Sequence, residues 1–384
     1  MRKIPLAIFA AAALSSAANA QTTDFKFGGF VKLDVMASKY NDGTKYNGSE
    51  AYSVLSDYYA PQGIPTGGEA SDLTWDIHAK TSRFNLSSTT KLDNGKTIKA
   101  FYEVDFLTGG GNERVSNSYS PRMRHAFVSY DNVLAGQTWS TFMNTSALPE
   151  VVDFVGPTEG IVFVRQGQIR YTAGDFQFSV ENPETQVAYE TSETSVAKTQ
   201  TDAASIPDFV ARYNFKAGDH SFAVSALARQ LKYEDAANDI SEDTMGFGFN
   251  FSGKMKFGMD DLTFSYTYGA VGRYVGTNLA PDAYMDVNGD IEAIDTTSAF
   301  VGYRHFWTDT VRSSFVYSYW SADTDEYALM SSYLKETSSV RANVMWSPEK
   351  NFTYGVELSH AEVEKAGGAE GSMDRLQFTA KYAF

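Results

Sequence analysis

Apolar and polar residues alternate with a period of two along many short segments of this chain. The last nine residues, 376–384, show it clearly and read LQFTAKYAF. A period of two places alternate side chains on the two faces of a β-strand, one toward an apolar medium and one toward water. A final strand of this kind that ends on an aromatic residue is typical of outer-membrane β-barrels.

The alternation predicts sixteen strands, and the connections between them are alternately short and long. The predicted strands are 24–36, 73–90, 96–107, 122–131, 133–142, 164–173, 176–182, 206–214, 220–230, 244–257, 261–273, 297–307, 311–320, 336–346, 352–361 and 374–384. Short connections such as Asp93-Asn94-Gly95 contain turn residues. Short periplasmic turns and long external loops indicate an all-β, antiparallel up-and-down transmembrane barrel, and sixteen strands leave a water-filled lumen. A soluble β-sandwich would not explain the short–long alternation.

The first 20 residues have the pattern of a secretory signal peptide. Arg2 and Lys3 precede an apolar run over residues 4–14, and Ala18-Asn19-Ala20 is a small-residue cleavage site. We therefore expect residues 1–20 to be removed and residues 21–384 to form a single barrel domain. The first predicted strand begins about four residues later, which leaves no room for a plug domain.

Charge and composition exclude several classes of protein. Without Arg2 and Lys3 the chain has 30 basic and 47 acidic residues, a net charge of −17, so nucleic acid is not an expected partner. Cysteine is absent, so no disulfide holds the fold, and a closed hydrogen-bonded barrel would do so instead. The 23 Tyr and 27 Phe suit aromatic girdles at the membrane interfaces.

Strand parity places most strand cations on the face opposite the apolar row, which is the lumen. An arginine or lysine side chain that faced lipid near the membrane midplane would destabilise the barrel by about 2–4 kcal/mol. Facing water, they bias which ions enter, or they pair with lumen acids such as Glu103 and Asp105 and only hold the barrel's shape. The predicted lumen cations are Lys32, Lys99, Arg170, Arg212, Arg304, Arg341, Arg375 and Lys381, while parity is ambiguous for Arg83, Arg122 and Arg124.

The third long connection, 143–163, is unusually apolar for an exposed loop. Folded inward, it would pack on the barrel wall and narrow the pore. Glu150, Asp153 and Glu159 would then stand opposite the arginines and create a transverse field across the eyelet. The alternative is an external loop that packs on neighbouring loops or on another subunit.

The other long loops contain much of the acidic excess, which indicates a solvated surface or sites for divalent cations that bridge to lipopolysaccharide. Asp286, Asn288 and Asp290 have the alternate spacing of a calcium loop, but Ile291 stands where the glycine of the sharp turn belongs. We expect no metal site and no cofactor. His78 and His125 could belong to an outer-membrane hydrolase, but lumen-facing polar residues are the preferred interpretation.

Several segments resemble the DcaP-like porins of Gram-negative bacteria. They are GQTWSTF at 136–142, ALPE at 147–150, FVRQGQIRY at 163–171, SVENPET at 179–185 and MWSP at 345–348. The resemblance covers essentially the whole mature chain and is most specific over 136–171. It implies a sixteen-stranded trimeric porin for small anionic solutes such as dicarboxylates, with Arg165 and Arg170 as leading eyelet residues. Some members have an N-terminal coiled-coil extension, for which residues 21–24 leave no room.

The sequence therefore predicts a non-enzymatic porin in the outer membrane, in contact with its lipids and lipopolysaccharide. Small anions would diffuse passively through it, and arginine and lysine side chains would replace part of their hydration. The alternative is a closed structural or adhesive barrel that acts through its acidic external loops.

Overall fold

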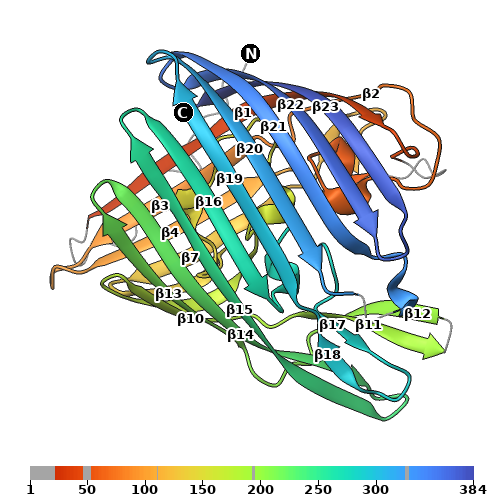
Figure 1. The fold of residues 1–384 in the computed structure, drawn as a ribbon. Helices are drawn as coiled ribbons and strands as arrows, with labels where there is room; N and C mark the ends of the chain where they lie inside the picture. The colour runs from red at the N-terminus through yellow and green to blue at the C-terminus, as the bar shows by residue number, and fades with distance from the viewer. Residues whose placement is uncertain (1–21, 46–52, 110, 193–194, 325–327) are drawn as a thin grey trace, which may run out of the picture.

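A computed structural model describes residues 22–45, 53–109, 111–192, 195–324 and 328–384. Its main feature is one large, closed, antiparallel β-barrel (Figure 1). The strands of the barrel are β1 (Thr23–Tyr40), β2 (Thr74–His78), β3 (Arg83–Lys91), β4 (Thr97–Asp105), β7 (Arg122–Tyr130), β8 (Val133–Trp139), β9 (Arg165–Ala173), β10 (Phe176–Glu181), β13 (Asp208–Ala217), β14 (His220–Asp235), β15 (Ile240–Phe257), β16 (Asp260–Gly269), β19 (Thr296–Phe306), β20 (Val311–Ala322), β21 (Leu334–Glu349), β22 (Phe352–Lys365) and β23 (Glu370–Ala383).

The barrel closes where the two ends of the chain meet. β1 pairs with β23 from Phe30↔Ala383 to Tyr40↔Met373. Beyond this ladder, the backbone N–H and C=O of Gly29 and Phe384 exchange hydrogen bonds of 3.1 and 3.2 Å. Because the barrel is closed, no unpaired strand edge faces lipid along this seam. A sheet that spans a membrane must be closed in this way, since lipid cannot hydrogen-bond the backbone groups of a free edge.

The predicted strand 73–90 is interrupted, because its two halves pair separately with β1. β2 lies beside Asp34–Ser38 and β3 beside Thr23–Phe30, so the two segments together fill one position of the barrel. At the break, the backbone N–H of Lys32 donates to Ser82 Oγ over 3.0 Å. Thr81 Oγ1 likewise donates to Asp34 over 2.6 Å. With β2 and β3 taken together, the described chain forms sixteen antiparallel strands around the barrel, as predicted.

The alternation of side chains also appears in the barrel. On β15, Phe247, Phe249 and Phe251 point outward and are exposed, whereas Asn250 and Ser252 are buried on the lumen side. Gly248 belongs to the inner face, and a Cβ there would lie 2.3 Å from a methyl group of Val271. The glycine thus allows an external loop to pack directly on the inner wall.

Three external loops fold into the barrel and form an apolar core inside it. The first loop, 41–73, contains η2 (Val54–Ser56) and η3 (Pro61–Gly63), and the third loop, 140–164, contains η4 (Thr145–Ala147) and η5 (Thr158–Gly160). The sixth loop, 270–295, contains η6 (Gly272–Tyr274). Buried residues from each, including Tyr59, Val162 and Tyr274, contact one another in a single cluster. The predicted inward fold of the third loop is thus confirmed.

Two of the long external connections contain strands that were not predicted from the sequence. β11 (Thr185–Ser192) and β12 (Ser195–Thr201) form a hairpin, and β17 (Ala283–Met285) and β18 (Ile291–Ala293) form another. β11 and β17 pair in parallel, which gives a four-stranded sheet at one end of the barrel (Figure 1). The remaining short elements are β5 (Gly111–Asn112), β6 (Ser118–Tyr119) and η7 (Ala328–Met330).

Among the described residues, no helix has the length and apolar character needed to cross a membrane.

Candidate pore constriction

The third loop is fastened to β19 and β20 through Glu150. Arg304 Nη1 donates to Glu150 Oε2 over 2.8 Å, and Arg312 donates to both carboxylate oxygens over 2.7 and 2.6 Å. Burial alone would raise the pKa of Glu150, but the hydrogen bonds and charges of Arg312 and Arg304 outweigh it and hold the pKa below its usual value. Glu150 is therefore ionised and bound to the wall.

Two residues shortly after Glu150, Val152 and Asp153, are held by β22. The carboxylate of Glu357 accepts hydrogen bonds from the backbone N–H groups of Val152 (2.9 Å) and Asp153 (3.4 Å). Arg341 Nη1 lies 3.7 Å from the same carboxylate. The Asp153 carboxylate accepts a hydrogen bond from the backbone N–H of Tyr59 over 2.9 Å and lies 3.8 Å from Arg375 Nη1. This one loop segment thus connects the wall with the first loop.

Glu159, the third acidic residue of the loop, is fully buried. It accepts a hydrogen bond from the hydroxyl of Tyr59 over 3.3 Å. Burial raises the pKa of Glu159, and the nearby charge of Arg341 only partly opposes this. All three loop acids are therefore engaged beside arginines or loop groups. The arginines of β19–β23 contact the loop from one wall, and the transverse field across the eyelet stays a prediction.

A second group of arginines surrounds the tip of the third loop on another wall. The guanidinium carbons of Arg83 (β3), Arg122 and Arg124 (both β7) lie 5.6, 5.7 and 5.5 Å from the centre of the Phe154 ring. Arg165, the first residue of β9, lies 4.5 Å from the centre of the Trp139 ring, and the charges of the other three act on it. We call Arg83, Arg122, Arg124 and Arg165 the eyelet cluster.

Two carboxylates on β4 form ion pairs with arginines of the eyelet cluster. Asp105 accepts from Arg122 over 2.7 Å and from Arg124 over 2.9 Å. Glu103 accepts from Arg124 over 2.7 Å and lies 3.8 Å from Arg83. Within the described part of the chain, no carboxylate oxygen lies within 4 Å of Arg165. Three of the four guanidinium groups therefore share two carboxylates, and the fourth has no carboxylate in contact.

The other group of arginines, Arg304, Arg312, Arg341 and Arg375, we call the anchor cluster. Its partners are Glu150, Asp153, Glu357 and Asp261, the last of which is paired with Arg304. Four guanidinium groups on this wall thus meet four carboxylates. Two of these carboxylates belong to the third loop itself.

The remaining predicted residues also face the lumen. Arg170 donates to the carbonyl of Trp139 and to Gln168, and Arg212 donates to the carbonyl of Met143 and to Asn144. Lys99 shares its face of β4 with Glu103 and is exposed. Parity thus placed the strand cations, but it did not reveal which of them have acidic partners.

Three arginines were missed in the sequence. Arg312 shares the parity of the buried Ser314 and Ser318, and this pattern could have identified it. Arg229 is buried on β14 between Asp208 and Asp282, and its parity is also that of the inner face. Arg273 lies in the sixth loop, where no periodic pattern could have indicated its 3.0 Å contact with Asp208.

The two candidate histidines and Asp286 form local hydrogen bonds. His125 Nδ1 lies 3.0 Å from Thr138 Oγ1, and His78 Nδ1 accepts a hydrogen bond from the Lys80 backbone N–H. Asp286 accepts hydrogen bonds from the backbone N–H groups of Asn288 and Asp290 within its own turn. No group of three or more potential metal ligands occurs among the described residues.

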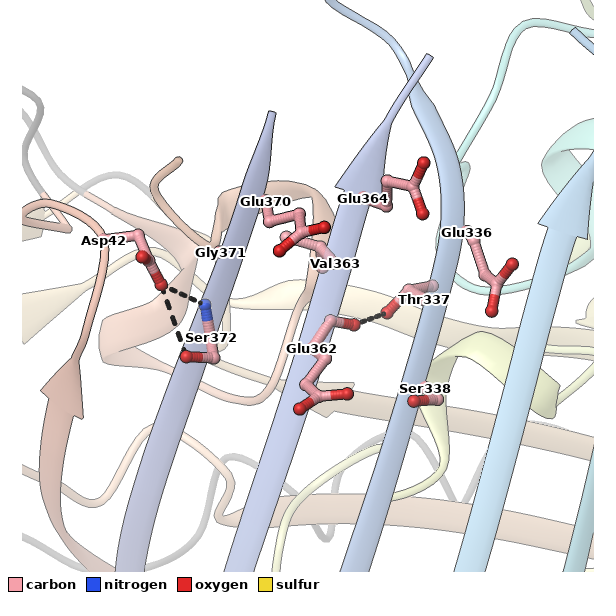
Figure 2. Close-up of a pocket in the computed structure, with 10 residues that line it drawn as sticks. All are labelled: Asp42, Glu336, Thr337, Ser338, Glu362, Val363, Glu364, Glu370, Gly371 and Ser372. Carbon is pink, nitrogen blue, oxygen red and sulfur yellow. Dashed lines mark hydrogen bonds between the residues drawn. The ribbon is translucent and has the colours of Figure 1, made fainter. Parts of the chain in front are cut away.

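Acidic side chains gather at the loop ends of β21, β22 and β23, where they line a pocket (Figure 2). The carboxylate of Asp42 accepts hydrogen bonds from the backbone N–H and hydroxyl of Ser372, and Thr337 donates to the backbone carbonyl of Glu362. The other acids of the pocket are Glu336, Glu364 and Glu370. Acidic side chains are thus concentrated at this rim of the barrel.

Comparison with known proteins decides the family. A family model described as DcaP outer membrane protein matches residues 17–384. The chain belongs to the DcaP outer membrane protein family. It is therefore an outer-membrane porin-family barrel, as predicted from its sequence. The predicted signal peptide lies outside the residues that the structure describes.

Solved structures share the fold of this DcaP family member. The outer membrane channel DcaP of Acinetobacter baumannii is 22% identical with a TM-score of 0.75, over 94% of this chain and 97% of that one. An anion-selective porin from Comamonas acidovorans is 13% identical with a TM-score of 0.56, over 94% and 100%. OmpT of Vibrio cholerae in its trimer form is 12% identical with a TM-score of 0.52, over 95% and 100%. A search of proteins with curated functions found no match.

Proposed function

We propose that this protein is a passive diffusion porin that prefers small hydrophilic anions, dicarboxylates among them. The eyelet cluster supports the proposal most directly, because its four guanidinium groups meet two carboxylates beside the tip of the third loop. An excess of fixed positive charge in a narrow aqueous passage attracts anions and repels cations. Such a pore uses no cofactor and no catalysis.

The proposed assembly is a homotrimer in contact with outer-membrane lipids and lipopolysaccharide. A solved structure of similar fold carries the description trimer form, and another is described as an anion-selective porin. Exposed aromatic residues on the outer wall, such as Phe249 and Trp346, suit a lipid or subunit interface.

A second candidate is a closed structural barrel. The observation in its favour is the apolar cluster that the first, third and sixth loops form inside the barrel. The two candidates differ in one property, which is whether hydrated solutes pass.

A planar bilayer with a KCl gradient tests both proposals. We expect conductance in steps of three and a reversal potential that is shifted from zero toward the equilibrium potential of chloride. A shift toward the equilibrium potential of potassium would contradict the anion preference. A complete lack of conductance would favour the closed barrel. Single steps would contradict the trimer.

A further inference from the structure

We infer that Arg170 and Arg212 form a binding site for a small dianion, separate from the eyelet cluster. This inference rests on the proposed function, because it concerns solutes that pass through the lumen. The two arginines lie on β9 and β13, and β10 runs between them. Arg170 is opposite Ser179, and Arg212 is opposite Gln177, two residues away on the same face of β10.

Both arginines are half-buried on the lumen face of their strands. Ser179 and Gln177 are two residues apart on β10 and share a face, so the two arginines paired with them lie on the same side of the sheet, and their long side chains can converge across β10. Like charges at such positions repel one another unless an anion lies between them. An anion with two negative charges would offset both.

Neutral acceptors fix the orientation of each guanidinium group. Arg170 donates from Nε and Nη2 to Gln168 Oε1 over 3.1 and 2.8 Å. Arg212 donates from Nε to Asn214 Oδ1 (2.8 Å), from Nη1 to the Met143 carbonyl (2.7 Å) and from Nη2 to Asn144 Oδ1 (3.0 Å). A planar guanidinium held in this way keeps its remaining N–H groups ready for an oxyanion.

Donors remain available for that anion. Arg170 Nη1 makes no hydrogen bond in the described part of the chain, and it is not among the atoms sealed from solvent. Within the same residues, no carboxylate lies within 4 Å of either guanidinium group. The nearest acid that acts on Arg170 is Glu181, whose oxygens already accept from Thr141, Ser179 and Gln166.

The backbone of Arg170 lies on the short-turn side of the eyelet cluster, while its guanidinium group reaches back to the carbonyl of Trp139. Arg165 begins β9 at the level of Trp139, and Arg170 follows five residues later, about 16 Å along the strand. The carbonyl of Trp139 accepts from Arg170, while the ring of Trp139 stacks with Arg165. A dianion that leaves the eyelet would thus meet this pair next.

Block of the chloride current by succinate tests the site. We would titrate potassium succinate, and in parallel potassium acetate, onto the trimer in KCl and measure the concentration that halves the current. The wild-type protein should be half-blocked at a much lower succinate than acetate concentration. R170Q and R212Q should each raise the succinate value about tenfold and leave the acetate value within twofold.

Two further variants make the test specific. K99Q removes a lumen charge on β4 outside the site and should leave the succinate value within twofold. R170K/R212K retains both charges without the planar groups and should recover part of the succinate block. Unchanged block in R170Q and R212Q, or a wild-type protein that does not distinguish succinate from acetate, would overturn the site. Cation preference of the wild-type pore in KCl would instead overturn the proposed function.

Discussion

The two arginine clusters have the same number of arginines but differ in how many carboxylates neutralise their charge. Each holds four guanidinium groups in the lumen, and the third loop lies between them. The anchor cluster meets four carboxylates, two of which belong to that loop. The eyelet cluster meets two, both on β4, and contacts the loop through the ring of Phe154. The compensated charges hold the loop in place, and the proposed role of the uncompensated charges is to act on solutes.

From this difference we expect the anchor cluster to hold the third loop and the eyelet cluster to influence selectivity. A buried ion pair contributes little net stability, but loss of one partner leaves an unpaired charge that is expensive to bury. Changes in the anchor cluster should therefore affect the position and stability of the third loop. Changes in the eyelet cluster should affect selectivity while the loop keeps its place.

The largest expected effect comes from Glu357, which holds two loop amides and Arg341. E357Q would leave the buried Arg341 without its charge partner and weaken both hydrogen bonds to the loop. We expect a loss of about 3 kcal/mol in the free energy of unfolding. Urea unfolding monitored by tryptophan fluorescence would measure it. E364Q, at the rim of the same strand, is the matched control and should be near neutral, so equal effects of the two variants would refute the anchor role.

Glu150 should give a smaller effect with a distinct signature. E150Q releases the third loop from Arg304 and Arg312, which are partly exposed and remain hydrated. We expect a loss of about 1–2 kcal/mol and larger current fluctuations in single-channel records. Anion preference should stay the same or rise, because a negative charge has been removed. A shift toward cation preference would contradict this interpretation.

The eyelet cluster should respond in selectivity rather than in stability. R83Q/R165Q would leave two guanidinium groups for two carboxylates. Loss of two charges near a narrow aqueous passage corresponds to about 1.4 kcal/mol, or about tenfold in the ratio of anion to cation permeability. K99Q, which removes one exposed lumen charge, should change the ratio by less than threefold. Tenfold loss in K99Q as well would show that the cluster has no special position.

The smallest expected effect concerns Glu159 and pH. Because burial raises its pKa, its carboxyl group favours folding below the ordinary glutamate pKa, and this contribution is lost as the pH rises through the raised value. E159Q stays neutral, so it should unfold at a slightly higher temperature than wild type at pH 7 and at the same temperature in acid. Glu150 has a lowered pKa, so its contribution is present above the ordinary value and is lost only as the pH falls through the lowered one. Equal stability of E159Q and wild type at both pH values would refute the assignment.

The barrel could be predicted from the sequence because strand parity and turn residues are local signals. The break in the second strand could not, because it depends on hydrogen bonds that join Ser82 and Thr81 to β1, about 50 residues away in sequence. Inward folding was predicted for the third loop from its apolar residues. The first loop is less apolar, and the sixth loop is about as apolar as the third but also acidic, yet Tyr59 and Tyr274 are buried in the same cluster.

The candidate site shows the same division. Parity placed Arg304 and Arg212 in the lumen, and the same rule would have found Arg312. It could not show that Arg312 pairs with Glu150, 162 residues away, while Arg165 stacks on Trp139 without a carboxylate. Such pairings depend on where an inward-folded loop meets the wall. The sequence therefore predicts which charges face the lumen, and only the fold shows which of them are uncompensated.

The most direct test compares R83Q/R165Q and E150Q with the wild type by their reversal potentials in one KCl gradient. Since the eyelet cluster is proposed to set selectivity and the anchor cluster to set loop position, R83Q/R165Q should move the reversal potential toward zero. E150Q should leave the reversal potential shifted toward the equilibrium potential of chloride, as in the wild type. If E150Q moved the potential toward zero and R83Q/R165Q did not, the division of tasks between the two walls would be wrong.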